Sequence, residues 1–298
     1  MELYFKGKNI YSDVKIKECI YDSRCDTHLS YLRIVFEDEN HKFDSYGFEI
    51  GDEIRLKDGK IDTKKLYINN INPDNARFEI VAHPVMREAM GETDNKKWKS
   101  VKFKKIINDI AKKHGLTTEY FGVENNQYKN IEQSNERDIV FVARMAILEG
   151  CIAVLFNGKL IIASKEYLKA QSASDFEIDK YNVSLKKKTE YKKCIVQGTE
   201  KTGKYTSASG SGTITYRMEI SSKAEGNRFA ENLLKHKNKN AHTGCVITDE
   251  LMGGYSGGTV VTIKSEDHTS AKGKALIDRV RHDLVNGKSK IWFECLEG

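Results

Sequence analysis

The sequence predicts an α+β protein that is mainly β, in which two β-rich segments flank a central α/β module. Three observations support this prediction. Short segments with alternating apolar residues run to about residue 85 and return after about residue 170. Between them, two stretches have the apolar spacing of helices. An Asn-Gly pair between two apolar runs, Asn157-Gly158, then predicts a tight β-hairpin.

The first segment consists of short strand patterns. "SYLRIVFED" places Leu32, Ile34 and Phe36 on one face of a strand. "GDEIRLKDGK" predicts a strand that leads into a turn at Asp58-Gly59, and "NPDN" at 72–75 predicts a turn between two further strands. Strands of this length and spacing favour a small barrel or sandwich.

The first predicted helix of the central module lies in "WKSVKFKKIINDIAKKHG". Ser100 is the predicted N-cap and Gly115 the predicted left-handed residue after the helix. Lysines cover the polar face, and the apolar face consists of Phe103, Ile106, Ile107, Ile110 and Ala111.

The second predicted helix begins near Ser134 or Asn135, either of which can cap it, and has Glu136 and Asp138 in its first turn. Gly150 ends it, and we expect a left-handed backbone there that makes a β-branched residue unfavourable. The narrow apolar stripe consists of Ile139, Ala143, Ala146 and Ile147.

In the last segment the strand patterns return. The stretch 199–212 has almost no apolar residue, so we expect a mobile loop that trypsin cuts first, at Lys201 or Lys204. "SKAEGNRFAENLLKHKN" predicts a helix, and the pair Asn286-Gly287 predicts a terminal hairpin.

Composition narrows the class of protein. Charged residues make up 31% of the 298 residues, the formal net charge is +6, and lysines cluster at 186–188 and 235–239. A nucleic-acid site would need a concentrated basic patch with interleaved aromatic residues. The spread of lysines therefore favours a solvated surface and no specific nucleic-acid partner, with a polyanion site as the alternative.

No apolar run approaches the roughly 18 residues of a membrane helix, and the N-terminus lacks a signal core, which predicts synthesis in the cytoplasm.

The cysteines predict no disulfide and no zinc site. No C-x-x-C pair is present, and several of these residues lie inside strand patterns. Buried free thiols in a reducing compartment fit best. The six are Cys19, Cys25, Cys151, Cys194, Cys245 and Cys295.

Candidates for catalysis are weak. His236 and His242 match no common metal spacing, and His282-Asp283 on a terminal hairpin favours a structural role. "GGYSGG" (253–258) resembles a nucleophile elbow around Ser256, but a strand pattern follows it where an elbow needs a helix. "GSGT" near Gly210 lacks the lysine of a phosphate loop. We assign no catalytic, cofactor-binding or metal-binding residue and expect no enzymatic activity and no cofactor.

The central module carries a family resemblance. "VKFKKIINDIAKKHGL", "IEQSNERDIVFVARMAILEG" and "IAVLFNGKLIIAS" resemble, in this order, the central region of the late control D family, the baseplate hub proteins of contractile phage tails and phage-tail-like bacteriocins. The family pattern has a basic helix that ends in His-Gly, followed by residues that correspond here to Gln133, Glu136, Asp138, Phe141 and Gly150.

The resemblance implies a fold and an assembly. It implies two tube-type β-barrel domains, 1–90 and 169–298, with the α/β module 91–168 between them. The implied function is a structural hub that joins the hexameric tail tube to the trimeric central spike. The implied partners are a homotrimer, the spike, the tube protein, and the tape measure and other baseplate proteins. We expect assembly in the bacterial cytoplasm, then residence in the baseplate of a virion or tail-like particle. A tail-associated cell-wall hydrolase, or a module that binds peptidoglycan or a polyanion, is the alternative.

Overall fold

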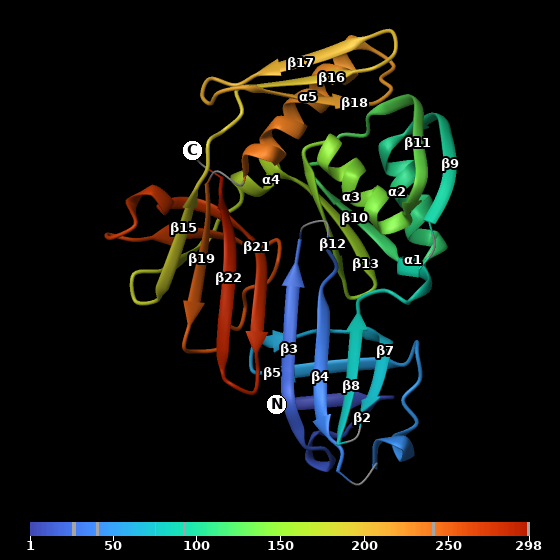
Figure 1. The fold of residues 1–298 in the computed structure, drawn as a ribbon, viewed down its shortest axis with the longest axis vertical. Coiled ribbons are helices and arrows are strands. Elements are labelled where there is room, and N and C mark those ends of the chain that lie inside the picture. The colour runs from blue at the N-terminus through green and yellow to red at the C-terminus, as the bar shows by residue number, and fades with distance from the viewer. Residues whose placement is uncertain (26–27, 40–41, 75, 92, 240–241, 297–298) are drawn as a thin grey trace.

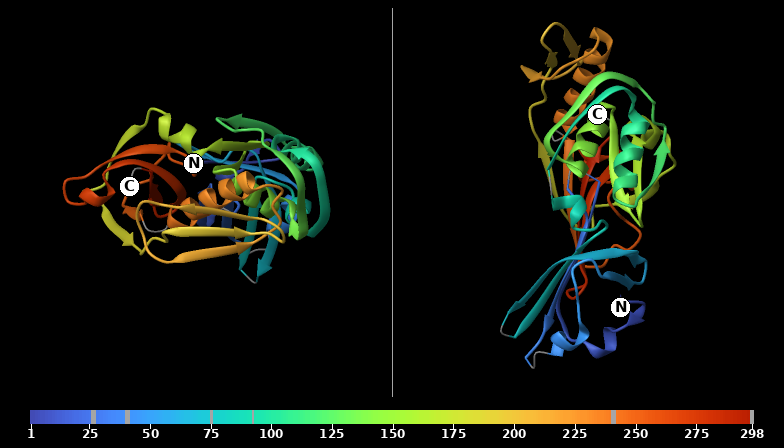
Figure 2. Two further views of the ribbon diagram at one scale, coloured as in Figure 1. Left: turned by 90° about the horizontal axis from the view of Figure 1, so that it is seen from above. Right: turned by 90° about the vertical axis from the view of Figure 1, so that its right-hand side faces the viewer.

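The computed structural model describes residues 1–25, 28–39, 42–74, 76–91, 93–239 and 242–296. Strands make up 49% and helices 20% of the structure, which confirms the mainly β, α+β prediction. The N-terminal strands form one end of an elongated molecule, as the blue ribbon in Figure 1 shows. The C-terminal strands and the helix-containing part lie side by side at the other end (Figures 1 and 2).

One large sheet runs through both β-rich segments. Its order is β15 (Asn182–Lys187), β19 (His242–Thr248), β22 (Lys288–Cys295), β21 (Gly273–Asp283), β3 (Ile16–Arg24), β4 (Tyr31–Glu37), β8 (Arg77–His83), β7 (Leu66–Asp74), β5 (Glu53–Asp58), β1 (Glu2–Phe5) and β2 (Lys8–Asn9). All neighbours on this path are antiparallel. β6 (Ile61–Asp62) pairs with β5, β20 (Val260–Lys264) pairs with β21, and β14 (Ser174–Glu177) is parallel to β20.

The expectation of two separate, closed barrels is wrong, since no barrel closes among the described residues. The physical reason lies in β21, which changes partner along its length. Residues 273–276 pair with β20, and residues 279–283 pair with β3. The change coincides with an irregularity between Ile277 and Arg279 in the pairing with β22. A bulge bends and twists a strand, so β21 can belong to the C-terminal sheet and extend the N-terminal one.

Each half of the large sheet has its own core. In β4, Leu32, Ile34 and Phe36 are fully buried, as the alternating pattern predicts. They pack in a cluster of the N-terminal half, where the rings of Phe36 and Phe43 are 4.5 Å apart. The C-terminal half has a second cluster, composed of Phe176, Ile178, Val246, Val261, Ile263, Ala271, Ala275, Ile277, Val280, Ile291 and Phe293.

The central module contains the predicted helices and hairpin. Its elements are α1 (Glu88–Gly91), β9 (Thr93–Lys102), α2 (Phe103–Lys113), β10 (Thr117–Phe121), β11 (Gln127–Arg137), α3 (Asp138–Leu148), β12 (Cys151–Phe156), β13 (Lys159–Ser164) and α4 (Lys165–Ala170). All five residues of the predicted apolar face of α2 are buried. β12 and β13 form the predicted hairpin, and Asn157 and Gly158 have positive φ angles of 51° and 71°.

Both predicted helix starts are wrong. α2 begins after Lys102 rather than at Ser100, and α3 begins after Arg137 rather than at Ser134 or Asn135. The reason is that β9 and β11 pair with each other as far as Lys102 and Arg137, the residues immediately before the two helices. Ser100 and Asn135 lie inside these strands with φ angles of 49° and 47°, and Glu136 also belongs to β11.

The expected mobile loop at 199–212 contains a strand. β17 (Thr202–Thr206) pairs with β16 (Lys193–Gln197), which also pairs with β18 (Thr213–Arg217). α5 (Lys223–Asn238), the predicted helix, packs against this sheet, and Gly203 meets Gly226 backbone to backbone. The apolar core of the central module continues into this unit through Cys194, Phe229 and Leu234. Low apolar content was therefore misleading, because two glycines provide the close packing that apolar side chains usually provide.

The terminal hairpin of β21 and β22 is confirmed, and Gly287 has a φ angle of 67°. The predicted turn at Asp58-Gly59 is also present, with Gly59 at 56°. The "NPDN" turn includes Asn75, which lies outside the described residues.

Gly203→Ala tests the strand that replaces the expected loop. A β-carbon at Gly203 would overlap the backbone of Gly226, so we expect a loss of at least about 1–3 kcal/mol in unfolding free energy. In wild type, trypsin should cleave other sites before it cleaves at Lys204. In the variant, Lys204 should become an early cleavage site. Gly91→Ala, where a β-carbon meets nothing within 4 Å, is the control. Rapid cleavage of wild type at Lys204 would contradict the strand.

Gly150→Val tests the end of α3. Gly150 has a φ angle of 68°, and a β-carbon there would lie 2.8 Å from Oδ1 of Asn232. Asn232 also donates to the carbonyl of Leu148 at 2.9 Å, so the clash disturbs a cap of α3. Backbone strain alone destabilises by about 1–2 kcal/mol.

Gly115→Val provides the matched control for this variant. Gly115 has a φ angle of 66° but no atom within 4 Å of its β-carbon position. Thermal unfolding should show a larger loss of stability for Gly150→Val than for Gly115→Val. Equal losses would exclude the contact with Asn232 as a contributor.

Candidate functional site

The seam between β3 and β21 is where the two halves of the large sheet join. Arg24 lies opposite Arg279 in the ladder, and Asp22 lies opposite Arg281. Two further backbone bonds extend the seam, from the amide of Cys25 to Asp278 at 3.0 Å and from Leu284 to Cys19 at 2.9 Å. This pairing joins residues that are about 250 positions apart in the sequence.

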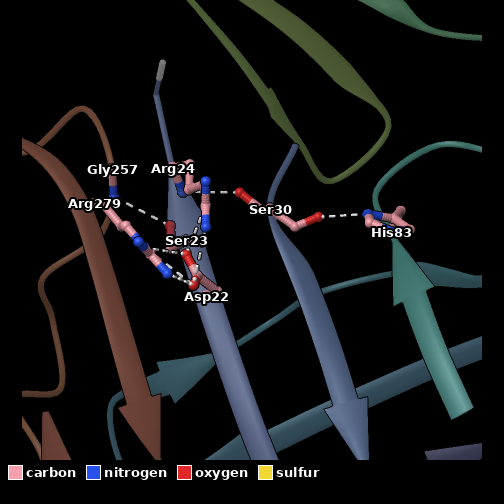
Figure 3. A network of polar contacts seen from close by, with 7 residues as sticks. All are labelled: Asp22, Ser23, Arg24, Ser30, His83, Gly257 and Arg279. Atoms are coloured by element: carbon pink, nitrogen blue, oxygen red, sulfur yellow. Dashed lines mark hydrogen bonds and ion pairs between the residues drawn. The ribbon is translucent and has the colours of Figure 1, made fainter. Parts of the chain in front are cut away.

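Asp22 is the buried charge of the seam. Its side chain is fully buried and accepts hydrogen bonds from Arg24 Nε at 2.8 Å and from Arg279 Nη2 at 2.5 Å (Figure 3). The two arginine side chains are 15% and 24% exposed, so each bridges the buried carboxylate and the solvent. Burial by itself would raise the pKa of Asp22, but the hydrogen bonds from Arg279 and Arg24 outweigh it and hold the pKa below its usual range.

Strands β4 and β8 extend this network. The Ser30 hydroxyl accepts from the backbone amide of Arg24 at 3.0 Å, and the Ser30 carbonyl lies 2.9 Å from Nδ1 of His83 (Figure 3). A carbonyl only accepts, so Nδ1 carries the proton. Burial lowers the pKa of His83, although the bond to Ser30 works in the opposite direction. His83, as a neutral ring, therefore holds Ser30 beside Arg24.

The "GGYSGG" segment docks onto the seam. The amide of Gly257 donates to the Ser23 hydroxyl at 3.1 Å (Figure 3). A β-carbon on Gly257 would overlap the backbone of Arg24 and Cys25, so only glycine fits. Ser256 lies in the turn, with its Oγ atom 3.2 Å from Oγ1 of Thr259. The motif that superficially resembles a nucleophile elbow thus packs one segment closely against β3.

The other predicted candidates are structural or buried. The ring of His282 lies 2.9 Å from the Ser289 hydroxyl, whereas Asp283 accepts from Asn286 in the adjacent turn. These neighbours therefore do not form an acid/base pair. Burial lowers the pKa of His282 to about 4.

His236 and His242, which match no common metal spacing in the sequence, show no sign of a metal site in the described structure. Burial and the charges of Lys239, Lys165 and Lys237 lower the pKa of His236 to about 4, and such a basic environment repels a cation. The side chain of His242 lies outside the described residues. Among the residues described, no three potential ligands gather closely enough to hold a metal ion.

The cysteines follow the prediction of free thiols. Four are buried, and Cys245 and Cys295 are half-buried. Burial raises the pKa of Cys194 to about 11 and that of Cys151 to about 12, so these thiols are protonated at neutral pH.

Two small cavities lie where the central module meets the large sheet. One of about 30 Å³ is bordered by Cys25, Lys165 and His236, and one of about 20 Å³ by Arg24 and Ser30. A small-molecule site has roughly 300–1,000 Å³, so each cavity has space for little more than a water molecule. In the described part of the chain, no helix has the length and apolar character needed to span a membrane.

Two residues of the family pattern, Gln133 and His114, meet at Asp138, which also belongs to the pattern. This carboxylate accepts from Gln133 at 2.8 Å and lies 2.7 Å from Nε2 of His114, so it ties the end of α2 to the start of α3. Glu136 pairs with Arg144 of α3 at 2.8 Å. These residues therefore position helices, which gives the pattern a structural basis.

Asp22→Asn tests the buried charge of the seam. The variant removes the negative charge that both Arg24 and Arg279 contact, and we expect about 3 kcal/mol less unfolding free energy at neutral pH. The folded-state pKa lies below the unfolded value of about 3.9. The contribution of Asp22 is therefore present above that pH and is lost as pH falls through the folded-state pKa.

The acid limb of the stability profile should be shallower in Asp22→Asn than in wild type. Asp249→Asn, at a carboxylate whose side chain is 93% exposed, should leave the profile nearly unchanged. Chemical denaturation over a series of pH values measures both variants. Equal stabilities of the two variants at neutral pH would contradict the role of Asp22.

Comparison with known proteins gives a match in structure and none in sequence. No family model matches the chain, and no curated protein matches it. The structure is similar to the 43 kDa tail protein of prophage MuSo2 from Shewanella oneidensis, with a TM-score of 0.73 and 10% identity over 98% of this chain and 97% of that one. It is also similar to the tail protein from Neisseria meningitidis MC58, with a TM-score of 0.74 and 9% identity over 98% and 95% of the two chains.

A third similar structure is the c3393 protein of E. coli, a component of the type VI secretion system described as structurally similar to the T4 tail proteins gp27 and gp5. Its TM-score is 0.62 at 12% identity, over 98% of this chain and 76% of that one. At these identities the likeness shows the fold alone. From end to end, the chain has the fold of phage tail proteins.

Proposed function

We propose that this chain is a structural baseplate hub protein of a contractile tail or tail-like particle, as the resemblance to the late control D family implies. The observation that carries the proposal is the end-to-end likeness to two tail proteins, which includes the helix-containing part as well as the sheets. The interior of the chain favours the same conclusion. Its buried polar residues hold elements together, and the cavities beside them are smaller than a substrate.

In this proposal the hub joins the hexameric tail tube to the trimeric central spike. Segments 1–90 and 169–298 are the two tube-like units, and segment 91–168 lies outside the ring. Three copies then present six such units to a six-fold tube and three unique ends to a spike. The particle assembles in the bacterial cytoplasm and carries the hub in its baseplate, with the tape measure among the neighbouring proteins.

The open sheet supports a ring. Its path ends at β15 on one side and at β2 on the other, and neither end strand has a second neighbour among the described residues. Exposed strand edges tend to pair with other chains. In the proposed trimer, contacts between copies cover these edges, which would give the closure that the single chain lacks.

Copy number in a complex tests this function. The chain, mixed with its cognate spike, should give particles with three copies of the chain per spike trimer by light scattering and native mass spectrometry. A stable dimer, or one chain bound to one spike monomer, would rule the hub out.

A pair of charge variants adds a matched control to this test. Asn182→Glu with Ser184→Glu puts like charges on the exposed face of β15 and should weaken the trimer. Asn130→Glu with Ser134→Glu makes the same change on exposed positions of β11 and should not. Both pairs are exposed in the single chain, so circular dichroism should be unchanged. A trimer that is lost equally in both variants would contradict the assignment of β15 to the ring.

A further inference from the structure

The positive charge of the chain is concentrated in one segment. Residues 93–113 contain eight lysines and two aspartates, a net charge of +6 that equals the net charge of the whole chain. The remaining residues are therefore balanced. The expectation of an evenly solvated surface overlooked this segment, because its lysines divide between a strand and a helix.

The fold brings the elements that carry these lysines together. β9 and β11 form a two-stranded ribbon, and α2 follows β9 directly. The right-hand view of Figure 2 shows the ribbon and α2 on the side of the molecule turned toward the viewer. We call this surface the lysine ribbon, and it consists of Lys96, Lys97, Lys99, Lys102, Lys104, Lys105, Lys112, Lys113 and Lys129.

Acidic residues neutralise only part of the lysine ribbon. Lys105 pairs with Asp109 and Lys113 with Asp94 and Asp138, while Lys97 lies 3.7 Å from Glu132. With the residues that the structure describes, the other six lysines make no ion pair. Lys96 and Lys104 lie over the rings of Trp98 and Tyr120, and the remaining four are exposed: Lys99, Lys102, Lys112 and Lys129. These four exposed cations therefore have neither a carboxylate nor an aromatic ring as partner in the described structure.

Trp98 provides a second, independent observation. Its side chain lies in β9 between the lysines and is only 7% exposed, and its indole Nε1 has no hydrogen-bond partner in the described structure. Lys96 covers the ring, with Nζ 3.7 Å from the ring centroid. A buried donor without an acceptor is unfavourable. An anion beside Lys96 would provide the countercharge that this lysine lacks among the described residues, and its approach would change the surroundings of the Trp98 ring.

We propose that the lysine ribbon binds the phosphate backbone of duplex nucleic acid without reading its sequence. This binding goes beyond the proposed hub function. Phosphate contacts need cations but no base readout. The ten residues of β9 extend over about 33 Å, which is the length of about ten base pairs.

The residue types disfavour other partners. Every basic residue in 93–113 is a lysine, which acts as a point charge, whereas arginine is the usual reader of guanine edges. Trp98 and Tyr128 are buried, so the ribbon offers no exposed ring on which the bases of a single strand could stack. Protein interfaces are depleted in lysine and enriched in exposed aromatic residues. A rigid duplex also loses less conformational entropy on binding than a flexible polymer does.

Salt dependence measures the number of contacts. For a short fluorescent duplex, four phosphate contacts predict a slope of log K against log salt of about −3.6. Lys99→Gln, Lys102→Gln and Lys129→Gln together should reduce it to about −1. The control combines Lys17→Gln, Lys223→Gln and Lys272→Gln. It removes the same charge from exposed positions elsewhere and should keep the wild-type slope. Equal loss in both triple variants, or no binding by wild type, would overturn the proposal.

Trp98 reports the location of the duplex. The chain has two tryptophans, so Trp292→Phe leaves Trp98 as the single reporter. Added duplex should change its fluorescence, whereas polyglutamate, polyglycerol phosphate and anionic vesicles should bind more weakly at matched salt. Duplex binding without a change in Trp98 emission would place the duplex elsewhere and contradict the proposal. Tighter binding of any competitor would assign the surface to that partner and contradict it equally.

Discussion

The pairing of β3 with β21 is the interaction on which the rest of the structure depends. It joins the first β-rich segment to the last through a ladder between residues 20–24 and 279–283. Without this pairing, β3 and β21 would each have an unpaired edge. The central module would then no longer pack against one continuous sheet. Asp22 makes the seam specific, because a fully buried carboxylate is tolerable only where both Arg24 and Arg279 reach it.

Glycines determine how closely the other parts can approach this frame. Gly257 lets the 253–258 segment lie directly on β3, and Gly203 lets β17 lie directly on α5. In both places a side chain would hold the backbones apart. These segments are poor in apolar residues, so close backbone packing and hydrogen bonds, such as that from Gly257 to Ser23, position them. Close packing against Gly226 also explains why part of the loop-like stretch 199–212, Thr202–Thr206, forms a strand.

The sequence predicted the local structure well and the long-range structure poorly. The buried face of α2, the left-handed glycines 115 and 150, and both Asn-Gly hairpins depend on neighbouring residues and were predicted correctly. The starts of α2 and α3 were wrong because the pairing of β9 with β11 competes with a local cap. The seam could not be predicted. Nothing in the alternation of β3 or β21 specifies a partner about 250 residues away, and Asp22 is one acidic residue in an otherwise ordinary strand.

The two β-rich halves form one large sheet, and native-state hydrogen exchange tests whether this sheet unfolds as one cooperative unit. The informative amides are those of Cys25 and Leu284, which bond across the seam to Asp278 and Cys19. They should exchange only through global unfolding, with the same free energy as core amides of β4 and β22. Exchange of the seam amides at a clearly lower free energy, while β4 and β22 retain full protection, would show that the halves separate and would contradict a single cooperative sheet.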